Sequence, residues 1–355
     1  MSYPIGHSGH GSRKKFVTLA KALPILGVAV LLAACSSGTP TSKGTAAAGS
    51  SNGSAKNINI VVIGGTSDDP FFSTVKNGVD AAAKSIEAAG GKVTYLSLAN
   101  YNNLGPDTAK LEATALSLHP SAVAVPDWVP TAQDPNLKAI SAAGIPLVIY
   151  NSGTIDNAKS VGAFTYIGGD YTLSGVAGGK EFVNAGAKNV VFVNTVPGDA
   201  SSEEFSTGYK QAMTAAGDKY TELNLPASSF GNATAVAQAI KSELLNNPSV
   251  DGIATYGVQD ASSAASAISQ ASAGSRVKLM GFNLDKNTLD RIKAGTQLGT
   301  IDQLPYPQGY YATSAAFQAA AYGIYISSSP VLTGPAIVDK SNVAKAIAGT
   351  AAGTR

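Results

Sequence analysis

The sequence predicts an α/β protein built from two doubly wound lobes, each a parallel sheet covered by helices, that face each other across a cleft. From residue 58 onward, short apolar runs of strand length alternate with longer stretches of helical period, which is typical of parallel sheets. The alternation starts again in mid-chain, after 166–170. About 320 of the 355 residues follow Ala34, which is too long a chain for one comfortable core.

The first series of elements opens with the apolar run 58–65, which ends in two glycines and predicts a strand. A helix over 73–89 follows, because Val75, Val79 and Ile86 fall on one helical face. The remaining elements of this series are strands at 93–98, 122–125 and 145–150 and helices at 107–118 and 135–143, the last of which stops at Gly144.

The second series follows Gly169 with the same alternation of elements. Aromatic residues recur from Tyr306 to Tyr325 near its end and predict a helix that packs into the core. Doubly wound sheets bind ligands outside the carboxyl ends of their strands, so the cleft between the lobes is the expected binding site. The other elements of this series are strands at 189–194, 252–256, 277–282 and 299–301 and helices at 173–185, 203–216, 233–246, 261–271 and 287–294.

The N-terminus carries the features of a secretory signal. Three basic residues at 13–15 precede an apolar stretch over 22–34, which is shorter than the ~20 residues of a membrane-spanning helix. The run Leu32-Ala33-Ala34-Cys35 resembles the lipobox of bacterial lipoproteins, which implies cleavage before Cys35 and acylation with palmitate or a similar lipid. An ordinary buried cysteine is the alternative. Residues 36–56 are rich in Ser, Gly and Thr and predict a flexible tether, so we expect lipid anchoring on the extracytoplasmic face of the cell membrane.

Composition weighs against several classes of function. Cys35 is the single cysteine, and His119 is the only histidine after the signal, so neither a Cys-His pair nor the usual zinc ligands can be assembled. His119 ends a predicted helix, where the helix dipole favours it, which argues against a Ser-His-Asp triad. Removal of the signal changes the formal net charge from +2 to −2, because its four charged residues are basic, and leaves no basic cluster for nucleic acid. We therefore expect no enzyme, no metal and no cofactor.

The loop that follows the first strand stands where a dinucleotide-binding fold places its glycine motif. The spacing G-x-G-x-x-G is absent there, and Asp68 and Asp69 would repel a pyrophosphate at the start of the helix. Phe71 and Phe72 can instead offer their rings to a ligand at the carboxyl end of the strand. Burial of both rings beneath the helix is the alternative.

A second candidate site follows the strand at 122–125, again at its carboxyl end. Trp128, the only tryptophan, predicts a stacking platform for the apolar face of a ring, and Asp127 can accept hydrogen bonds from hydroxyl groups. Packing of the indole against the protein is the alternative to the platform.

Four motifs recur in a characteristic order along the chain. Asp69-Pro70-Phe71-Phe72, followed by Lys76-Asn77-Gly78, precedes Gly144-Ile145-Pro146, and Met280-Gly281-Phe282-Asn283 precedes Thr300-Ile301-Asp302-Gln303. The ordered set resembles the sugar-binding branch of the type I periplasmic binding proteins, the ribose-binding-like receptors of ABC importers. The resemblance covers about 57–342, nearly the whole chain after the tether.

This resemblance implies three crossings between the lobes, near 168–169, 303–304 and 332–333, and hence a three-stranded hinge. It assigns 57–168 plus 304–332 to lobe 1 and 169–303 plus 333–345 to lobe 2. The remaining segments are 1–34 as signal peptide, 35–56 as tether and 346–355 as a C-terminal tail.

The binding positions of the family fall on residues of this chain one by one. An asparagine of the family falls on Asp69, and its ring contacts fall on Phe71 and Phe72. An aspartate and an arginine fall on Asn151 and Ser152. The remaining positions are an arginine at Phe205, an aromatic contact at Phe230, an asparagine contact that we place at Gln259, an aspartate at Asn283 and the hinge glutamine at Gln303.

These departures from the family's pattern remove charge from the expected site. Two carboxylates are replaced by the amides of Asn151 and Asn283, and two guanidinium groups are replaced by Ser152 and Phe205. Charge-assisted hydrogen bonds are roughly twice as strong as neutral ones, whereas an amide can both donate and accept. We therefore expect a small neutral sugar or polyol, bound by amides and by apolar contact.

The function implied by the resemblance is that of a monomeric receptor that closes two lobes on its ligand and presents the closed form to ABC permease subunits. A sensor of the same fold that signals to a membrane receptor is the first alternative. An enzyme is disfavoured by the composition, and a transcriptional regulator with these lobes would need a basic helix-turn-helix in place of the signal.

Overall fold

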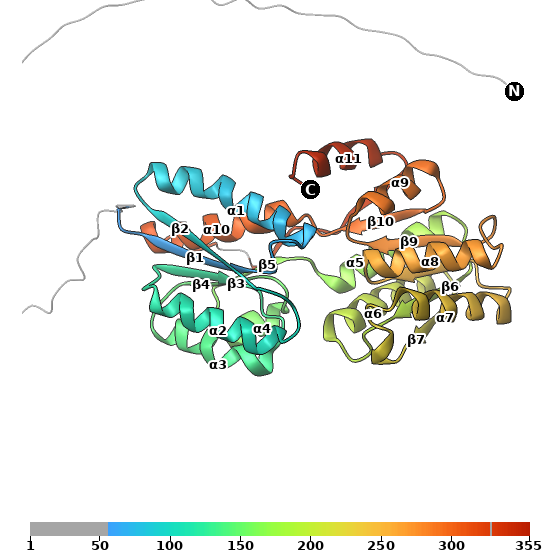
Figure 1. Cartoon of the computed structure of the whole chain (residues 1–355), viewed down its shortest axis with the longest axis horizontal. Coiled ribbons are helices and arrows are strands. Elements are labelled where there is room, and N and C mark those ends of the chain that lie inside the picture. The colour runs from blue at the N-terminus through green and yellow to red at the C-terminus, as the bar shows by residue number, and fades with distance from the viewer. Residues whose placement is uncertain (1–55, 327–328) are drawn as a thin grey trace, which may run out of the picture. The chain divides into compact units, whose positions relative to one another are not determined.

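The computed structural model describes residues 56–326 and 329–355, which contain two six-stranded sheets (Figure 1). The strand orders are β11-β5-β4-β3-β1-β2 in lobe 1 and β12-β10-β9-β8-β6-β7 in lobe 2. Among the described residues, every strand pairing is parallel except that of β10 with β12. The prediction of two doubly wound parallel-sheet lobes is confirmed. The signal, the tether up to residue 55 and Cys35 lie outside the described residues.

Lobe 1 buries its sheet between two groups of helices. One face packs against α1 and α10 through a cluster that contains Val75 and Ala316, and the other packs against α2 and α3 through Ala115 and Leu137. The strands are β1 (Asn59–Gly64), β2 (Lys92–Ser97), β3 (Ala122–Val125), β4 (Leu147–Asn151), β5 (Thr165–Gly168) and β11 (Val331–Leu332), and the helices are α1 (Pro70–Ala88), α2 (Leu104–Ser117), α3 (Pro130–Ala142), α4 (Ile155–Ser160) and α10 (Pro305–Tyr322).

Lobe 2 repeats this arrangement of layers. Phe182 and Tyr209 of α5 and α6 pack on one face of the sheet, and Ile240 and Ile268 of α7 and α8 pack on the other. The strands are β6 (Asn189–Asn194), β7 (Lys219–Asn224), β8 (Gly252–Thr255), β9 (Lys278–Phe282), β10 (Gly299–Asp302) and β12 (Ala336–Asp339), and the helices are α5 (Tyr171–Asn184), α6 (Ala200–Ala215), η1 (Ala227–Ser229), α7 (Ala233–Asn246), α8 (Val258–Gln270), α9 (Lys286–Ala294) and α11 (Val343–Ala351).

Three connections carry the described chain from one sheet to the other: β5 to α5, β10 to α10 and β11 to β12. The C-terminal residues make further contacts beside these connections. Arg355 Nε lies 2.6 Å from Asp302 Oδ2 at the end of β10, and Asn77 Nδ2 of α1 donates to the carbonyl oxygen of Gly353 at 2.9 Å. The segment 346–355, expected as a tail, contains most of α11, whose Ala346 is buried.

Three of the elements that the sequence pattern missed, β7, β11 and α4, lack a continuous apolar run. Strand β7 lies at a sheet edge with Glu222 among mostly exposed residues, β11 has two residues, and α4 has six. Helix α3 begins at Pro130 rather than at Pro135, which lies inside it. These elements form because neighbouring strands and helices supply their hydrogen bonds and contacts, which a local pattern does not record.

The predicted core packing of the aromatic residues in the last long helix holds for Phe317, which packs against the lobe 1 core, but not for Tyr310, Tyr311 and Tyr322. Tyr311 and Tyr322 of α10 are 46% and 47% exposed, and Tyr325 beyond it is 53% exposed, so the prediction that they belong to the core is wrong. Small residues of α10 are buried instead. Helix α10 also lies very close to α1, so that a Cβ on Gly309 would overlap the backbone of Val75. The buried residues include Gly309, Ala312, Ala315, Ala316 and Ala319.

A second close crossing of helices, between α5 and α6, organises lobe 2. A Cβ on Gly208 would overlap the carbonyl oxygen of Thr172, and a Cβ on Gly175 would overlap that of Phe205. Backbone atoms cannot move aside as a flexible side chain can, so this crossing requires glycine on both helices.

We predict that Gly208→Ala lowers the free energy of unfolding by about 1 to 3 kcal/mol, because the added methyl group forces α5 and α6 apart. Urea denaturation followed by circular dichroism measures this change. Gly274→Ala is the matched control, since a Cβ there has no atom within 4 Å, and it should change stability by less than about 0.5 kcal/mol. Equal stability of the two variants would contradict the close-packing argument.

Candidate functional site

Three aromatic side chains from two strand ends of lobe 1 form one cluster. Phe71 and Phe72 begin α1 after β1, and Trp128 follows β3, the neighbouring strand. The ring centroids of Phe72 and Trp128 are 5.4 Å apart with an edge-to-face orientation, and those of Phe71 and Phe72 are 5.3 Å apart. Phe72 is 6% exposed and belongs to the core, whereas Phe71 and Trp128 are partly exposed. Phe72 therefore supports the indole, and the two other rings can face a ligand.

The carboxylate of Asp69 is committed to the protein. It caps α1, with Oδ1 accepting from Phe71 N at 2.8 Å, and Oδ2 accepts from the Tyr101 hydroxyl at 2.6 Å. The Tyr101 hydroxyl in turn accepts from Thr66 N at 3.1 Å. Asp69 thus fixes the loop before α1 and has less capacity left for a ligand. Tyr101 was not anticipated, because it lies in a loop after β2 without a motif.

Unlike Asp69, Asp127 has a carboxylate oxygen without a hydrogen-bond partner among the described residues. Asp127 is 1% exposed. Its Oδ2 atom is 3.5 Å from Asn157 Nδ2, and its Oδ1 atom has no hydrogen-bond partner among the described residues. Burial, with a smaller contribution from the charge of Asp134, raises the pKa of Asp127 to about 6. A buried acceptor without a donor is unfavourable, so this carboxylate is suited to hydrogen bonds from hydroxyl groups.

Four amide side chains form a hydrogen-bonded chain from the end of β4 to the ends of β9 and β10. Asn151 Nδ2 donates to Gln308 Oε1 at 3.2 Å, and Gln308 Nε2 donates to the carbonyl oxygen of Gln303 at 2.9 Å. Gln303 Nε2 then donates to Asn283 Oδ1 at 2.8 Å. Asn151, Gln303 and Asn283 were predicted from the sequence. Gln308, which is fully buried in α10 and joins them, was not.

The backbone also marks these strand ends. Asn151 and Asn283 have φ angles of 62° and 69°, in the left-handed region that asparagine tolerates better than most residues. The carbonyl oxygen of Asn151 accepts from the hydroxyl groups of Tyr166 and Tyr171 at 3.0 and 3.4 Å. Both amide side chains therefore start from fixed turns, which limits how far they can move.

The expected contacts in lobe 2 are more dispersed. Phe205 is fully buried among Tyr209, Tyr256 and Phe282, so its ring supports the aromatic core and offers no face to a ligand in this structure. Phe230 is 68% exposed, and Gln259 is exposed in the first turn of α8. Gln259 makes no described side-chain hydrogen bond to the amide chain, and the Phe230 ring lies in none of the described ring pairs.

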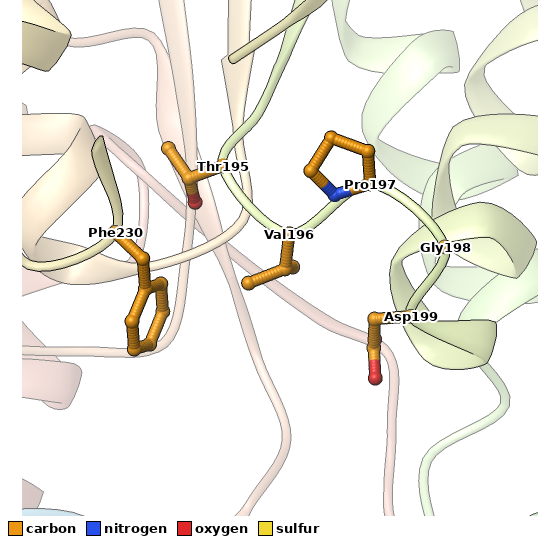
Figure 2. A pocket seen from close by; sticks show the side chains of 6 residues that line it. All are labelled: Thr195, Val196, Pro197, Gly198, Asp199 and Phe230. Atoms are coloured by element: carbon orange, nitrogen blue, oxygen red, sulfur yellow. The ribbon is translucent and has the colours of Figure 1, made fainter. Parts of the chain in front are cut away.

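Two pockets lie in this region, one lined in part by Phe230 and the other in part by Glu204, which precedes Phe205. Figure 2 shows the first, where Phe230 and Val196 project from two loops of lobe 2, and Thr195, Pro197, Gly198 and Asp199 complete the lining. The second is lined by residues of both lobes near their first connection. Its charged residues are Asp156 and Lys159 of α4, Asp170 before α5, and Glu204 of α6, whose pKa is raised chiefly by burial.

The chemistry available in this arrangement is hydrogen bonding and ring contact. Amides supply donors and acceptors, Asp127 supplies an acceptor, and the indole of Trp128 supplies an apolar surface. Within 56–326 and 329–355, no group of three or more His, Cys, Asp or Glu side chains could hold a metal ion. None of the helices in that part of the chain is long and apolar enough to cross a membrane.

Comparison with known proteins places these features in context. A family model described as a periplasmic binding protein domain matches residues 60–323. A carbohydrate transporter from Acidothermus cellulolyticus, solved in complex with myo-inositol, is 30% identical, with coverage of 84% of this chain and 100% of that one and a TM-score of 0.71. No curated protein sequence matches this chain.

Two further solved structures share the fold at lower identity. A periplasmic ribose ABC transporter from Conexibacter woesei is 18% identical, with coverage of 85% of this chain and 98% of that one and a TM-score of 0.73. A glucose-galactose binding protein from Geobacillus stearothermophilus is also 18% identical, with coverage of 81% and 99% and a TM-score of 0.70.

We predict that Gln308→Leu lowers the free energy of unfolding by about 1 to 3 kcal/mol, because it leaves the amide of Asn151 without its acceptor and leaves the Gln303 carbonyl group with Thr333 Oγ1 as its remaining donor. Urea denaturation measures the loss. Gln318→Leu, on an exposed position of the same helix, is the control and should change stability by less than about 0.5 kcal/mol. A Gln308→Leu variant as stable as this control would show that the amide chain is not coupled to folding.

Proposed function

This chain belongs to the periplasmic binding protein domain family, and from that premise we propose that it captures a neutral cyclic polyol or sugar outside the cytoplasm and delivers it to an ABC importer. Members of this family and the similar structures are binding proteins of extracytoplasmic transport systems, several of them named for sugars. The proposal concerns which ligand this chain takes and how it is held.

The observation that carries the proposal is the hydrogen-bonded chain of uncharged amides at the facing strand ends. Asn151 of lobe 1 and Asn283 of lobe 2 are joined through Gln308 and Gln303. Amides recognise hydroxyl groups as donors and as acceptors but offer no counter-charge to an anion. Asp127, with one oxygen free of described partners, disfavours an anion further.

The ring of a polyol also suits the aromatic cluster. The indole of Trp128, in edge-to-face contact with Phe72, can lie against the apolar face of a cyclic ligand while the ligand's hydroxyl groups point to Asp127 and the amides. Myo-inositol, the ligand named for the 30% identical transporter, is an uncharged ring in which each carbon bears a hydroxyl group. We take it as the first candidate ligand.

Delivery requires the two lobes to approach each other. Because the three connections lie next to Gln303 and Asn151, a ligand that bonds to both lobes favours a closed form by the difference in its affinity for the two forms. ABC permease subunits in the membrane would recognise that closed form. Lipid on Cys35 would keep the receptor at the membrane surface, with a tether of about twenty residues that spans roughly 25 Å as a flexible chain.

Isothermal calorimetry of the chain from residue 36 onward tests the choice of ligand. We predict saturable binding of myo-inositol or another neutral polyol, and a loss of affinity of about tenfold or more in Trp128→Ala, since stacking and apolar contact both disappear. Tyr322→Ala, which removes an exposed ring at the far end of α10, is the control and should bind as the unmodified chain does. Binding of an anionic ligand with all neutral polyols silent would refute the proposal.

Membrane attachment is tested separately by Cys35→Ala in the full-length chain. We predict that this variant binds polyol with unchanged affinity but appears in the soluble fraction of cells, because without acylation nothing in the tether is apolar enough to hold it. Fractionation followed by immunoblotting measures the distribution. Retention of Cys35→Ala in the membrane fraction after removal of the signal 1–34 would contradict lipid anchoring through this cysteine.

A further inference from the structure

One buried amide side chain binds the backbone on both sides of Asp127 and Trp128. Gln133 of α3 accepts a hydrogen bond from Val129 N through Oε1 at 2.8 Å and donates from Nε2 to the carbonyl oxygen of Pro126 at 2.8 Å. The residues on both sides of Asp127 and Trp128 are therefore bound by the same side chain. Gln133 is fully buried, so water does not compete for these hydrogen bonds.

The second hydrogen of this amide is bound by a buried carboxyl group on the neighbouring helix. Gln133 Nε2 donates to Glu112 Oε1 of α2 at 2.8 Å, and Glu112 is also fully buried. The start of α2 also lies close to this turn and to α3, since a Cβ on Gly105 would lie 2.9 Å from Cβ of Val129 and 2.9 Å from Cβ of Ala132 in α3. Both helices thus fix the turn, one through packing and one through hydrogen bonds.

Burial of a carboxyl group costs free energy of folding unless each of its oxygen atoms finds a partner. Glu112 Oε2 has no partner among the described residues, and burial raises the pKa of Glu112 to about 7, with smaller increases from the charges of Asp127 and Asp134 and decreases from Gln133 and Asn136. An apolar side chain of similar size would pack at lower cost. What an apolar side chain cannot do is accept the amide hydrogen and so define the orientation of Gln133.

We propose that Gln133 and Glu112 are positioning residues of the ligand site: the Gln133 amide sets the 126–129 turn so that Trp128 and Asp127 face the ligand, and Glu112 holds that amide in place. This role rests on the proposed polyol site, because the turn matters for binding only if Asp127 and Trp128 contact the ligand. Neither residue touches the ligand itself.

The test uses Trp128 as its own reporter, since it is the only tryptophan. In Gln133→Leu, Val129 N and the Pro126 carbonyl group lose their partner, so we expect a shifted Trp128 emission maximum and easier acrylamide quenching in the ligand-free protein. We also expect myo-inositol affinity, measured by calorimetry, to fall by about tenfold or more.

The variants at Glu112 separate positioning from simple stability. Glu112→Leu removes the acceptor and should alter emission and affinity in the same direction as Gln133→Leu. Glu112→Gln keeps an acceptor oxygen and should restore both, with affinity within about threefold of the unmodified chain. This pair also carries the test if Gln133→Leu does not fold.

Gln297→Leu is the matched control, because Gln297 is an equally buried glutamine in lobe 2 that binds the Gly299 carbonyl group and Arg291. It should lower the melting temperature while Trp128 emission and affinity stay unchanged. Folded Gln133→Leu and Glu112→Leu variants with unaltered Trp128 emission would overturn the positioning role. If the unmodified chain does not bind myo-inositol, that candidate ligand fails, and the emission data still decide whether the turn is set by Gln133 and Glu112.

Discussion

Parallel strand pairing is the constraint on which the whole site depends. Because β1, β3 and β4 are neighbours that run in one direction, their carboxyl ends meet at one edge and bring Phe72, Trp128 and Asn151 together from separate parts of the chain. The same rule places Asn283 and Gln303 side by side at the ends of β9 and β10. Close helix crossings at Gly309 and Gly208 hold together the helices that cover one face of each sheet.

Under the proposed function, a site that binds its ligand mainly through amides has consequences for how binding is driven. The amides of Asn151, Gln303 and Asn283 are already bonded to other protein groups in this structure, so a ligand would exchange one neutral hydrogen bond for another. The net gain from such an exchange is only about 0.5 to 1.5 kcal/mol for each bond. Under the proposed function, affinity must therefore draw on apolar contact with Trp128 and on fixed geometry, which lowers the entropy lost on binding.

The sequence predicts those parts of the fold that local periodicity encodes. Buried strands such as Ala122–Val125 and Asn189–Asn194 and the helix Ala233–Asn246 were placed at their observed bounds, because each is a compact apolar or amphipathic run with clear turn residues at its ends. Strand β7 could not be found in this way, since a sheet edge with exposed charges has no apolar run.

In the candidate site, too, some features follow from local sequence patterns and others do not. A strand end can be located from the sequence, so the positions of Asp127, Asn151 and Asn283 beside one edge of each sheet follow from the pattern. Which atoms meet there depends on helices far away in the chain: Gln308 is 157 residues from Asn151, and Gln133 is 21 from Glu112. Their residue types carry no local signal, because a buried glutamine and an exposed one look alike in a sequence. The same limit explains Phe205, whose neighbour Phe282 comes from a distant strand.

Two buried acceptor atoms beside the proposed ligand site lack donors in the described part of the chain. Asp127 Oδ1 and Gln303 Oε1 are both buried and lack a hydrogen-bond partner among the described residues. Each unsatisfied acceptor costs about 1 to 3 kcal/mol, and these two lie at the 126–129 turn and at the connection after β10. Under the proposed function, a ligand whose hydroxyl groups reach both acceptors would remove both penalties at once. An anionic ligand would add repulsion at an ionised Asp127, which supports the proposal of a neutral polyol on grounds independent of the amide substitutions.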